Sequence, residues 1–149
     1  MLIVHTLEVA APAETVWRVV TDLDRYPEWN PFVVGCRSTL APGSPIVMRV
    51  RVLPLVAQPQ RETIFEHVPG KRLSYGIAPM PFGALASTRS HEVEAVATDR
   101  ARYVSRFELS GWLAPVVEAL LGGRLRSGFT AMSTALVARA EALHAGRSG

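Results

Sequence analysis

The last third of the chain predicts one long amphipathic helix, and this helix limits the folds that the rest of the chain can adopt. Between residues 115 and 144, apolar side chains recur at spacings of three and four, which places them on one stripe of a helix. The stripe comprises Val117, Leu120, Leu121, Leu125, Phe129, Met132, Leu136 and Leu143. Gly122 and Gly123 interrupt this stripe, and each lowers helix stability by roughly 1 kcal/mol relative to alanine. A kink in the helix, or a close approach of its backbone to a sheet, would explain their presence. Such a stripe has to be buried against another element.

The residues before this helix predict a strand, two short helices and six further strands. Residues 2–10 are typical of a strand, 12–21 of a short amphipathic helix, and 22–31 of a second short helix or turn. The later strands are expected at 33–40, 46–52, 61–68, 73–78, 85–97 and 101–111. Turn signals such as Pro69-Gly70-Lys71 join neighbouring strands as hairpins, which indicates an antiparallel sheet. We therefore expect a single α+β domain over residues 1–149, ordered from about 2 to 144, with the long helix on the concave face of the sheet.

Apolar residues are more abundant than a core of this size usually requires. They make up 48% of the 149 residues, charged residues make up 19%, and the mean hydropathy is +0.17. These values exclude a disordered chain and a charged coiled coil. The longest uncharged stretch, 73–88, is broken by prolines and glycines, so we expect no membrane span. The first residues alternate like a strand without a basic leader, so we expect a cytoplasmic protein.

Charged and metal-binding residues lack the clustering of a nucleic-acid or metal site. The net charge is +3, and Lys71 is the only lysine among 16 basic residues, the arginines being spread along the chain. We therefore expect no nucleic-acid partner. Metal-ligand spacings and phosphate- or dinucleotide-binding motifs are absent from the sequence, so we expect no metal and no cofactor. Cys36, the only cysteine, is expected to be a small packed side chain.

Three stretches resemble a known family. Residues 8–17 lead into a segment that contains Tyr26-Pro27-Glu28-Trp29, and residues 69–73 and 107–115 follow later in the chain. Together they resemble START-like proteins of the polyketide cyclase/dehydrase and lipid-transport type, also called SRPBCC domains. The resemblance covers about residues 2–144. It implies a helix-grip fold, in which a curved seven-stranded antiparallel sheet wraps a long C-terminal helix around a cavity for apolar ligands. These proteins share no single catalytic motif, so the resemblance assigns no catalytic residue.

Arg89 and His91 form the most unusual pair in the sequence. On the strand 85–97 they share a face with Leu85, Ser87 and Val93, whereas the glutamates alternate onto the other face. The odd-numbered face is therefore expected to point at the helix. His91 could act there as an acid or base, and Arg89 could bind a carboxylate or stabilise an enolate. Alternatively, both side chains lie at the open end of the strand and contact water.

Several further side chains are expected to line the cavity or its entrance. The cavity walls would be formed by Met48, Val50, Tyr75, Tyr103, Ser105, Phe107, Phe129 and Met132. The tyrosines could instead be core residues with satisfied hydroxyls. Trp29 and Asn30 are expected at the entrance, although Tyr26 and Trp29 could instead be structural plugs that close one end.

Two connecting segments, 53–59 and 78–85, are unusually apolar and rich in proline. Loops are normally polar and exposed. These two, with Phe82 in the second, could be lids that contact the ligand, a membrane surface or a second subunit. Alternatively, they fold back onto the rim of the sheet.

Three functions remain open at this point. The favoured hypothesis is a protein that binds a small hydrophobic molecule, such as a polyketide, a lipid or an isoprenoid. The second is a cofactor-independent polyketide cyclase, aromatase or dehydratase, in which Arg89 polarises a carbonyl and His91 moves a proton. The third is a protein-interaction module that uses the two apolar loops, for example to form a homodimer.

Overall fold

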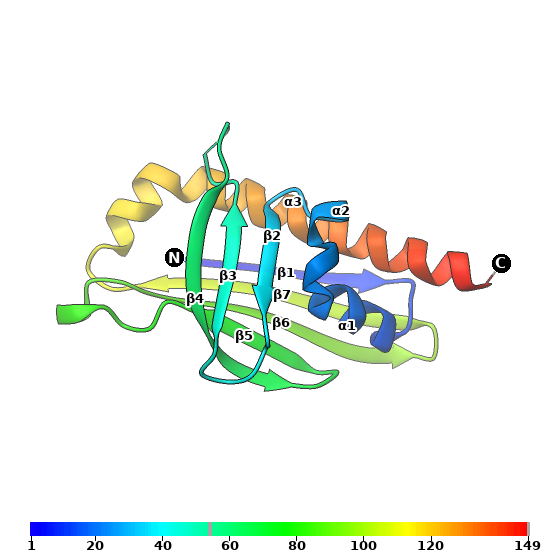
Figure 1. The fold of residues 1–149 in the computed structure, drawn as a ribbon. Coiled ribbons are helices and arrows are strands. Elements are labelled where there is room, and N and C mark those ends of the chain that lie inside the picture. Colours follow the sequence, from blue (N-terminus) through cyan, green and yellow to red (C-terminus); the bar gives the residue numbers. More distant parts are fainter. Residues whose placement is uncertain (54, 149) are drawn as a thin grey trace.

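The computed structural model describes residues 1–53 and 55–148, and its elements follow the predicted order (Figure 1). They are β1 (Leu2–Val9), α1 (Ala13–Thr21), the 3₁₀ helix η1 (Leu23–Arg25), α2 (Tyr26–Trp29), β2 (Val33–Ser38), β3 (Pro45–Val50), β4 (Gln58–Val68), β5 (Arg72–Gly76), the 3₁₀ helix η2 (Pro81–Gly83), β6 (Ala86–Ala97), β7 (Arg100–Ser110) and α3 (Ala114–Ser148). The predicted α+β class and helix-grip architecture are confirmed. The boundaries differ in places: β4 begins at Gln58, earlier than expected, and α3 continues to Ser148.

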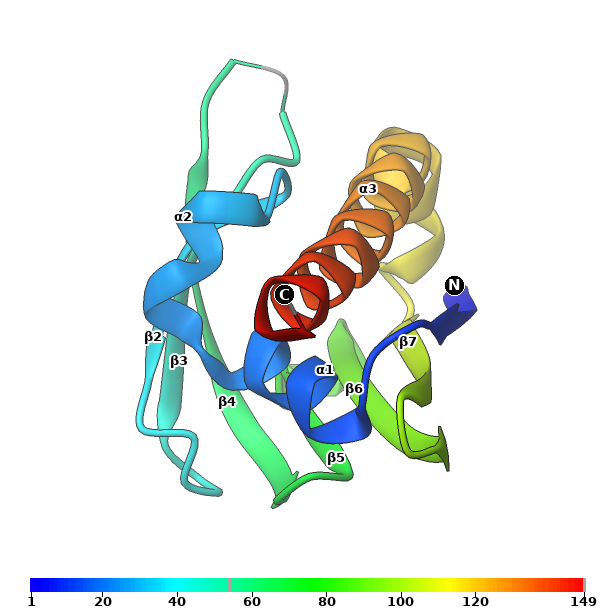
Figure 2. The same cartoon turned by 90° about the vertical axis from the view of Figure 1, so that its right-hand side faces the viewer.

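The seven strands form one antiparallel sheet in the order β1-β7-β6-β5-β4-β3-β2. Because α1 and α2 connect β1 to β2, the chain crosses from one edge of the sheet to the other between these two strands. Register shifts in the β2–β3, β4–β5 and β6–β7 ladders add local bends. Figure 2 shows the result, a sheet that curves around α3 with β2 and β3 on one side and β7 on the other.

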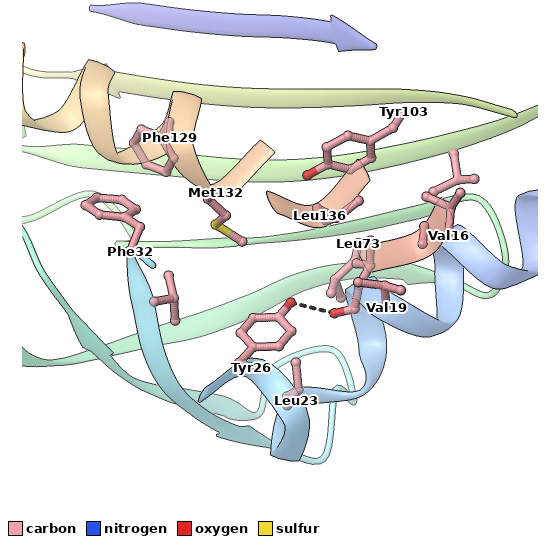
Figure 3. Close-up of a cluster of buried hydrophobic side chains, with 14 of the residues drawn as sticks. Val16, Val19, Leu23, Tyr26, Phe32, Leu73, Tyr103, Phe129, Met132 and Leu136 are labelled. Carbon is pink, nitrogen blue, oxygen red and sulfur yellow. Dashed lines mark hydrogen bonds between the residues drawn. The ribbon is translucent and has the colours of Figure 1, made fainter. Parts of the chain in front are cut away.

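The C-terminal half of α3 packs into a solid core. Met132, Leu136 and Ala140 are fully buried there, and α1 contributes Val16 and Val20 to the same cluster. Figure 3 shows this cluster, in which the hydroxyl of Tyr26 donates a hydrogen bond of 2.6 Å to the carbonyl of Val20. The helix α1 also contacts β6 and β7, so it covers this end of the sheet.

The N-terminal half of α3 is packed differently. Leu120 is 75% exposed and Leu121 is half-buried, so this half buries less of its surface than the other. A close approach occurs instead at Gly128, five residues after Gly123, where a Cβ atom would overlap the ring of Phe32. Gly123 has open space around it. Among the residues that the structure describes, no helix is both long enough and apolar enough to cross a membrane.

Candidate functional site

A cavity of about 180 Å³ lies between the sheet and the N-terminal half of α3. Its wall is mostly apolar and is formed by Phe32, Val33, Met48, Val50, Val52, Gln60, Glu62, Tyr75, Ile77, Leu85, Ser87, Arg89, Phe107, Leu109, Val117, Leu121, Leu125 and Phe129. The sequence-predicted residues in this wall are Met48, Val50, Tyr75, Arg89, Phe107 and Phe129. The polar side chains in it come from β4, β5 and β6. The cavity is therefore an apolar space with a few polar groups on one side.

Arg89 places a buried cation in this wall. Its side chain is on the inner face of β6, opposite Phe107 of β7, and the residue is 4% exposed. Its Nη1 donates hydrogen bonds to Ser105 Oγ at 2.6 Å and to the carbonyls of Ser90 at 3.3 Å and Arg106 at 3.4 Å. These bonds fix the position of the guanidinium, which lies 4.8 Å from the centre of the Phe129 ring.

Glu62 on β4 is a cavity residue that the sequence analysis did not single out. Burial raises the pKa of this carboxyl to about 7, although the positive charge of Arg89 opposes the shift. A group with such a pKa is charged in part of the molecules and neutral in the rest near neutral pH, as an acid–base group requires. The signal was present in the sequence, because Glu62 alternates onto the same face of its strand as the buried Ile64.

His91 lies in the solid core and is not among the cavity-lining residues. It is fully buried, and its Nε2 lies 3.1 Å from the hydroxyl of Tyr75 and its Nδ1 2.6 Å from that of Tyr103. Burial and, to a smaller extent, the charge of Arg89 hold the pKa of His91 well below its usual value. The ring is therefore neutral at pH 7, with one nitrogen as donor and the other as acceptor. Tyr75 connects it to the cavity wall.

The remaining predicted residues are not part of the cavity wall. Ser105 and Met132 are buried behind Arg89 and contact its guanidinium, and Tyr103 contacts His91. Trp29 packs edge-on against Tyr26 with ring centres 5.1 Å apart. The side-chain oxygen of Asn30 accepts hydrogen bonds from the backbone N–H groups of residues 32 and 33, at 3.0 and 2.8 Å, and so joins α2 to β2.

The two apolar loops flank the cavity and expose their tips. Leu55 is 94% and Phe82 is 97% exposed, whereas Val52 and Leu85 at the ends of these loops line the cavity. Pro54, also in the first loop, lies outside the described residues. Trp112 Nε1 donates a hydrogen bond of 3.1 Å to the carbonyl of Phe82, which ties the second loop to the start of α3. In the part of the chain that the structure describes, no three His, Cys, Asp or Glu side chains come together as a metal site would need.

Comparison with protein families matches residues 2–141 to the family described as polyketide cyclase/dehydrase and lipid transport. The chain belongs to this family. The START-like resemblance inferred from residues 8–31, 69–73 and 107–115 is thereby confirmed. A comparison with curated proteins finds no match.

Solved structures with the same fold include proteins of several kinds. A START superfamily protein from Mycobacterium smegmatis is 22% identical with a TM-score of 0.70, the match covering 95% of this chain and 98% of that one. The Zhui aromatase/cyclase from Streptomyces sp. R1128 is 17% identical with a TM-score of 0.73, over 95% and 93% of the two chains. Norcoclaurine synthase from Thalictrum flavum, a point mutant in complex with a transition-state analogue, is 18% identical with a TM-score of 0.67, over 94% and 93%. At these identities the likeness shows the fold.

Proposed function

We propose that this member of the polyketide cyclase/dehydrase and lipid-transport family binds a small hydrophobic molecule in the cavity between its sheet and α3. The observation that carries the proposal is the cavity of about 180 Å³ itself. It occupies a space that side chains would fill in a close-packed protein interior. Sites for drug-sized ligands measure roughly 300–1,000 Å³. The cavity therefore favours a compact skeleton of one or two rings, or a short chain, over a full-length lipid.

Adjacent leucines on α3 provide a matched test of this proposal. Leu121 lines the cavity, whereas Leu120 points to solvent. We expect Leu121→Trp to fill the cavity and to abolish the binding of the molecule that mass spectrometry finds in the purified wild-type protein. Leu120→Trp adds the same ring outside and should retain that molecule. Retention of the molecule by Leu121→Trp would contradict binding in the cavity.

A second candidate function is cofactor-independent catalysis of the cyclase, aromatase or dehydratase type. It is favoured by Glu62, because a carboxyl with a pKa of about 7 shares the cavity with Arg89. Arg89 would hold a carbonyl oxygen as negative charge develops on it, and Glu62 would move the proton. In this scheme His91 acts through Tyr75, whose hydroxyl it holds at the cavity wall.

Turnover and binding separate the two candidates. If the protein is an enzyme, the molecule that co-purifies with Glu62→Gln is the substrate, and added wild-type protein converts it into a product of different mass or structure. Glu62→Gln should then lose at least about a hundredfold in turnover, the lower end for a general acid or base, while it keeps the affinity. Recovery of the unchanged molecule from wild-type protein after prolonged incubation would favour the pure binding function.

A further inference from the structure

Arg89 is a buried cation without a carboxylate partner among the residues that the structure describes. All ion pairs among the described residues involve other, more exposed arginines. Removing a charge from water is unfavourable unless it is paired and hydrogen-bonded. The cavity thus holds an uncompensated positive charge in an apolar wall.

Arg89 lines the cavity, and part of its guanidinium lacks a strong hydrogen-bond acceptor. Nη1 already has three oxygen partners, at Ser105 and at the carbonyls of Ser90 and Arg106. The hydroxyl of Tyr103 also interacts with the guanidinium. Nη2 contacts Met132 Sδ at 3.7 Å, and a thioether is only a weak acceptor. Because a guanidinium presents its donors in a planar fork that matches a carboxylate, an anion in the cavity would supply both the missing charge and a better acceptor.

Glu62 does not already fill this role. Its carboxyl faces the same cavity from β4, but burial raises its pKa to about 7, so it does not provide a permanent negative charge. The titratable groups that interact with Glu62 are Cys36 on β2, Tyr75 on β5 and Arg89 on β6. Arg89 in turn interacts with Tyr103, His91 and Tyr26. The part of α3 that faces the cavity contributes only apolar side chains.

We propose, on the basis of the cavity-binding function above, that the ligand is a compact hydrophobic carboxylic acid, bound as its anion with the carboxylate on Arg89 and the apolar skeleton against α3. The protonated carboxyl of Glu62 shares the cavity with this anion and is a potential hydrogen-bond donor to it. The ligand thereby supplies the counter-charge that the described residues do not provide.

Binding of such an anion is coupled to the protonation of Glu62. A second negative charge in the cavity disfavours the ionised form of Glu62, so complex formation takes up a proton near pH 7. The affinity should therefore fall as the pH rises from 6 to 8, by about fivefold if the bound anion raises the pKa of Glu62 by about one unit. Glu62→Gln cannot ionise and should bind with an affinity that hardly changes over this range.

Three probes with one skeleton test the proposal by calorimetric titration: 3-phenylpropanoate, 3-phenylpropan-1-ol and 3-phenylpropan-1-amine. At pH 6 the wild-type protein should bind the carboxylate at least about tenfold more tightly than the alcohol, since hydrogen bonds between charged groups are stronger than those to a neutral hydroxyl. The ammonium form should bind more weakly than both. Arg89→Gln should lose the preference for the acid and keep the affinity for the alcohol. Arg61→Gln, which removes the same charge from the exposed face of β4, should behave like wild type.

The outcomes separate this inference from the proposed function. Equal affinities for the acid and the alcohol in wild-type protein would overturn the carboxylate proposal and leave cavity binding intact. Failure of all three probes to bind would contradict the cavity-binding function itself. If Arg89→Gln does not fold, the wild-type comparison and the pH profile of Glu62→Gln still decide, because neither changes Arg89.

Discussion

Burial shifts the pKa values of Glu62 and His91 in opposite directions. Glu62, beside the cavity, has its pKa raised to about 7, and His91, in the core, has its pKa held well below its usual value. Both shifts disfavour the charged form, because charge is poorly solvated away from water. Near pH 7 His91 is therefore neutral, and Glu62 is the group that can exchange a proton.

We expect Glu62→Gln to stabilise the protein above pH 7. The folded state binds more protons at Glu62 than the unfolded state does between about pH 4.5 and 7, so wild-type stability contributed by this group is lost as the pH rises through that window. Glutamine does not ionise and escapes this loss. Urea unfolding at pH 5 and pH 8 should show little difference between the two proteins at pH 5 and a higher free energy of unfolding for Glu62→Gln at pH 8. Glu94→Gln, on an exposed part of β6, is the control, and a gain of the same size there would contradict the explanation.

Tyr26 has a structural role that Tyr26→Phe should reveal. Its ring is buried, and its hydroxyl donates a hydrogen bond of 2.6 Å to the carbonyl of Val20 near the end of α1. Removal of the hydroxyl leaves a buried acceptor without its partner, which costs about 1–3 kcal/mol. The measurement is urea unfolding at neutral pH. An unchanged unfolding midpoint would show that the hydrogen bond does not contribute to stability.

At the scale of one element, α3 combines two environments along a single helix. Its C-terminal half packs against α1 and the sheet (Figure 3). Its N-terminal half borders the cavity. The boundary lies near Phe129, which stacks on Phe107 with ring centres 4.7 Å apart and meets Phe32 at 5.0 Å. These aromatic rings close the hollow end against the solid core.

Two glycines of α3 should respond differently to substitution by alanine. Gly123 has open space, so Gly123→Ala should stabilise the protein by up to about 1 kcal/mol through helix propensity. At Gly128 a Cβ atom would overlap the buried ring of Phe32, and the ring cannot move without disturbing Phe129. Gly128→Ala should therefore be net destabilising, by about 1–3 kcal/mol.

Urea unfolding of both glycine variants under one set of conditions provides the comparison. A stabilised Gly128→Ala would mean that the Phe32 ring has a second position available, which the packing around it does not indicate.

At the scale of the whole molecule, one sheet serves two purposes. At its covered end α1 contacts β6 and β7. His91 on β6 is fully buried between Tyr75 and Tyr103. At its other end, the sheet and α3 leave the cavity, flanked by the exposed tips of the two apolar loops. The abundance of apolar residues is thereby divided among a solid core, a cavity wall and exposed loops.

Hydrogen exchange should report this division. The backbone amides of residues 129–140 should exchange more slowly than those of residues 115–125, because fewer buried contacts hold the hollow end of the molecule. Saturation with 3-phenylpropanoate should slow exchange in 115–125 and leave 129–140 nearly unchanged. Equal protection of both segments in the free protein would contradict a hollow and a solid end.

The sequence by itself determined the order of the elements and the faces of most strands, because hydrophobic periodicity is a local property. It predicted that Arg89 and His91 point inward from the same strand, and both are buried. Only the tertiary structure decided that they have different surroundings: Arg89 borders a cavity, whereas His91, two residues further along β6, is enclosed in the core between Tyr75 and Tyr103. Glu62 becomes important for the same reason. Alternation reports which face a side chain occupies, but the space in front of that face depends on helices that are distant in the sequence.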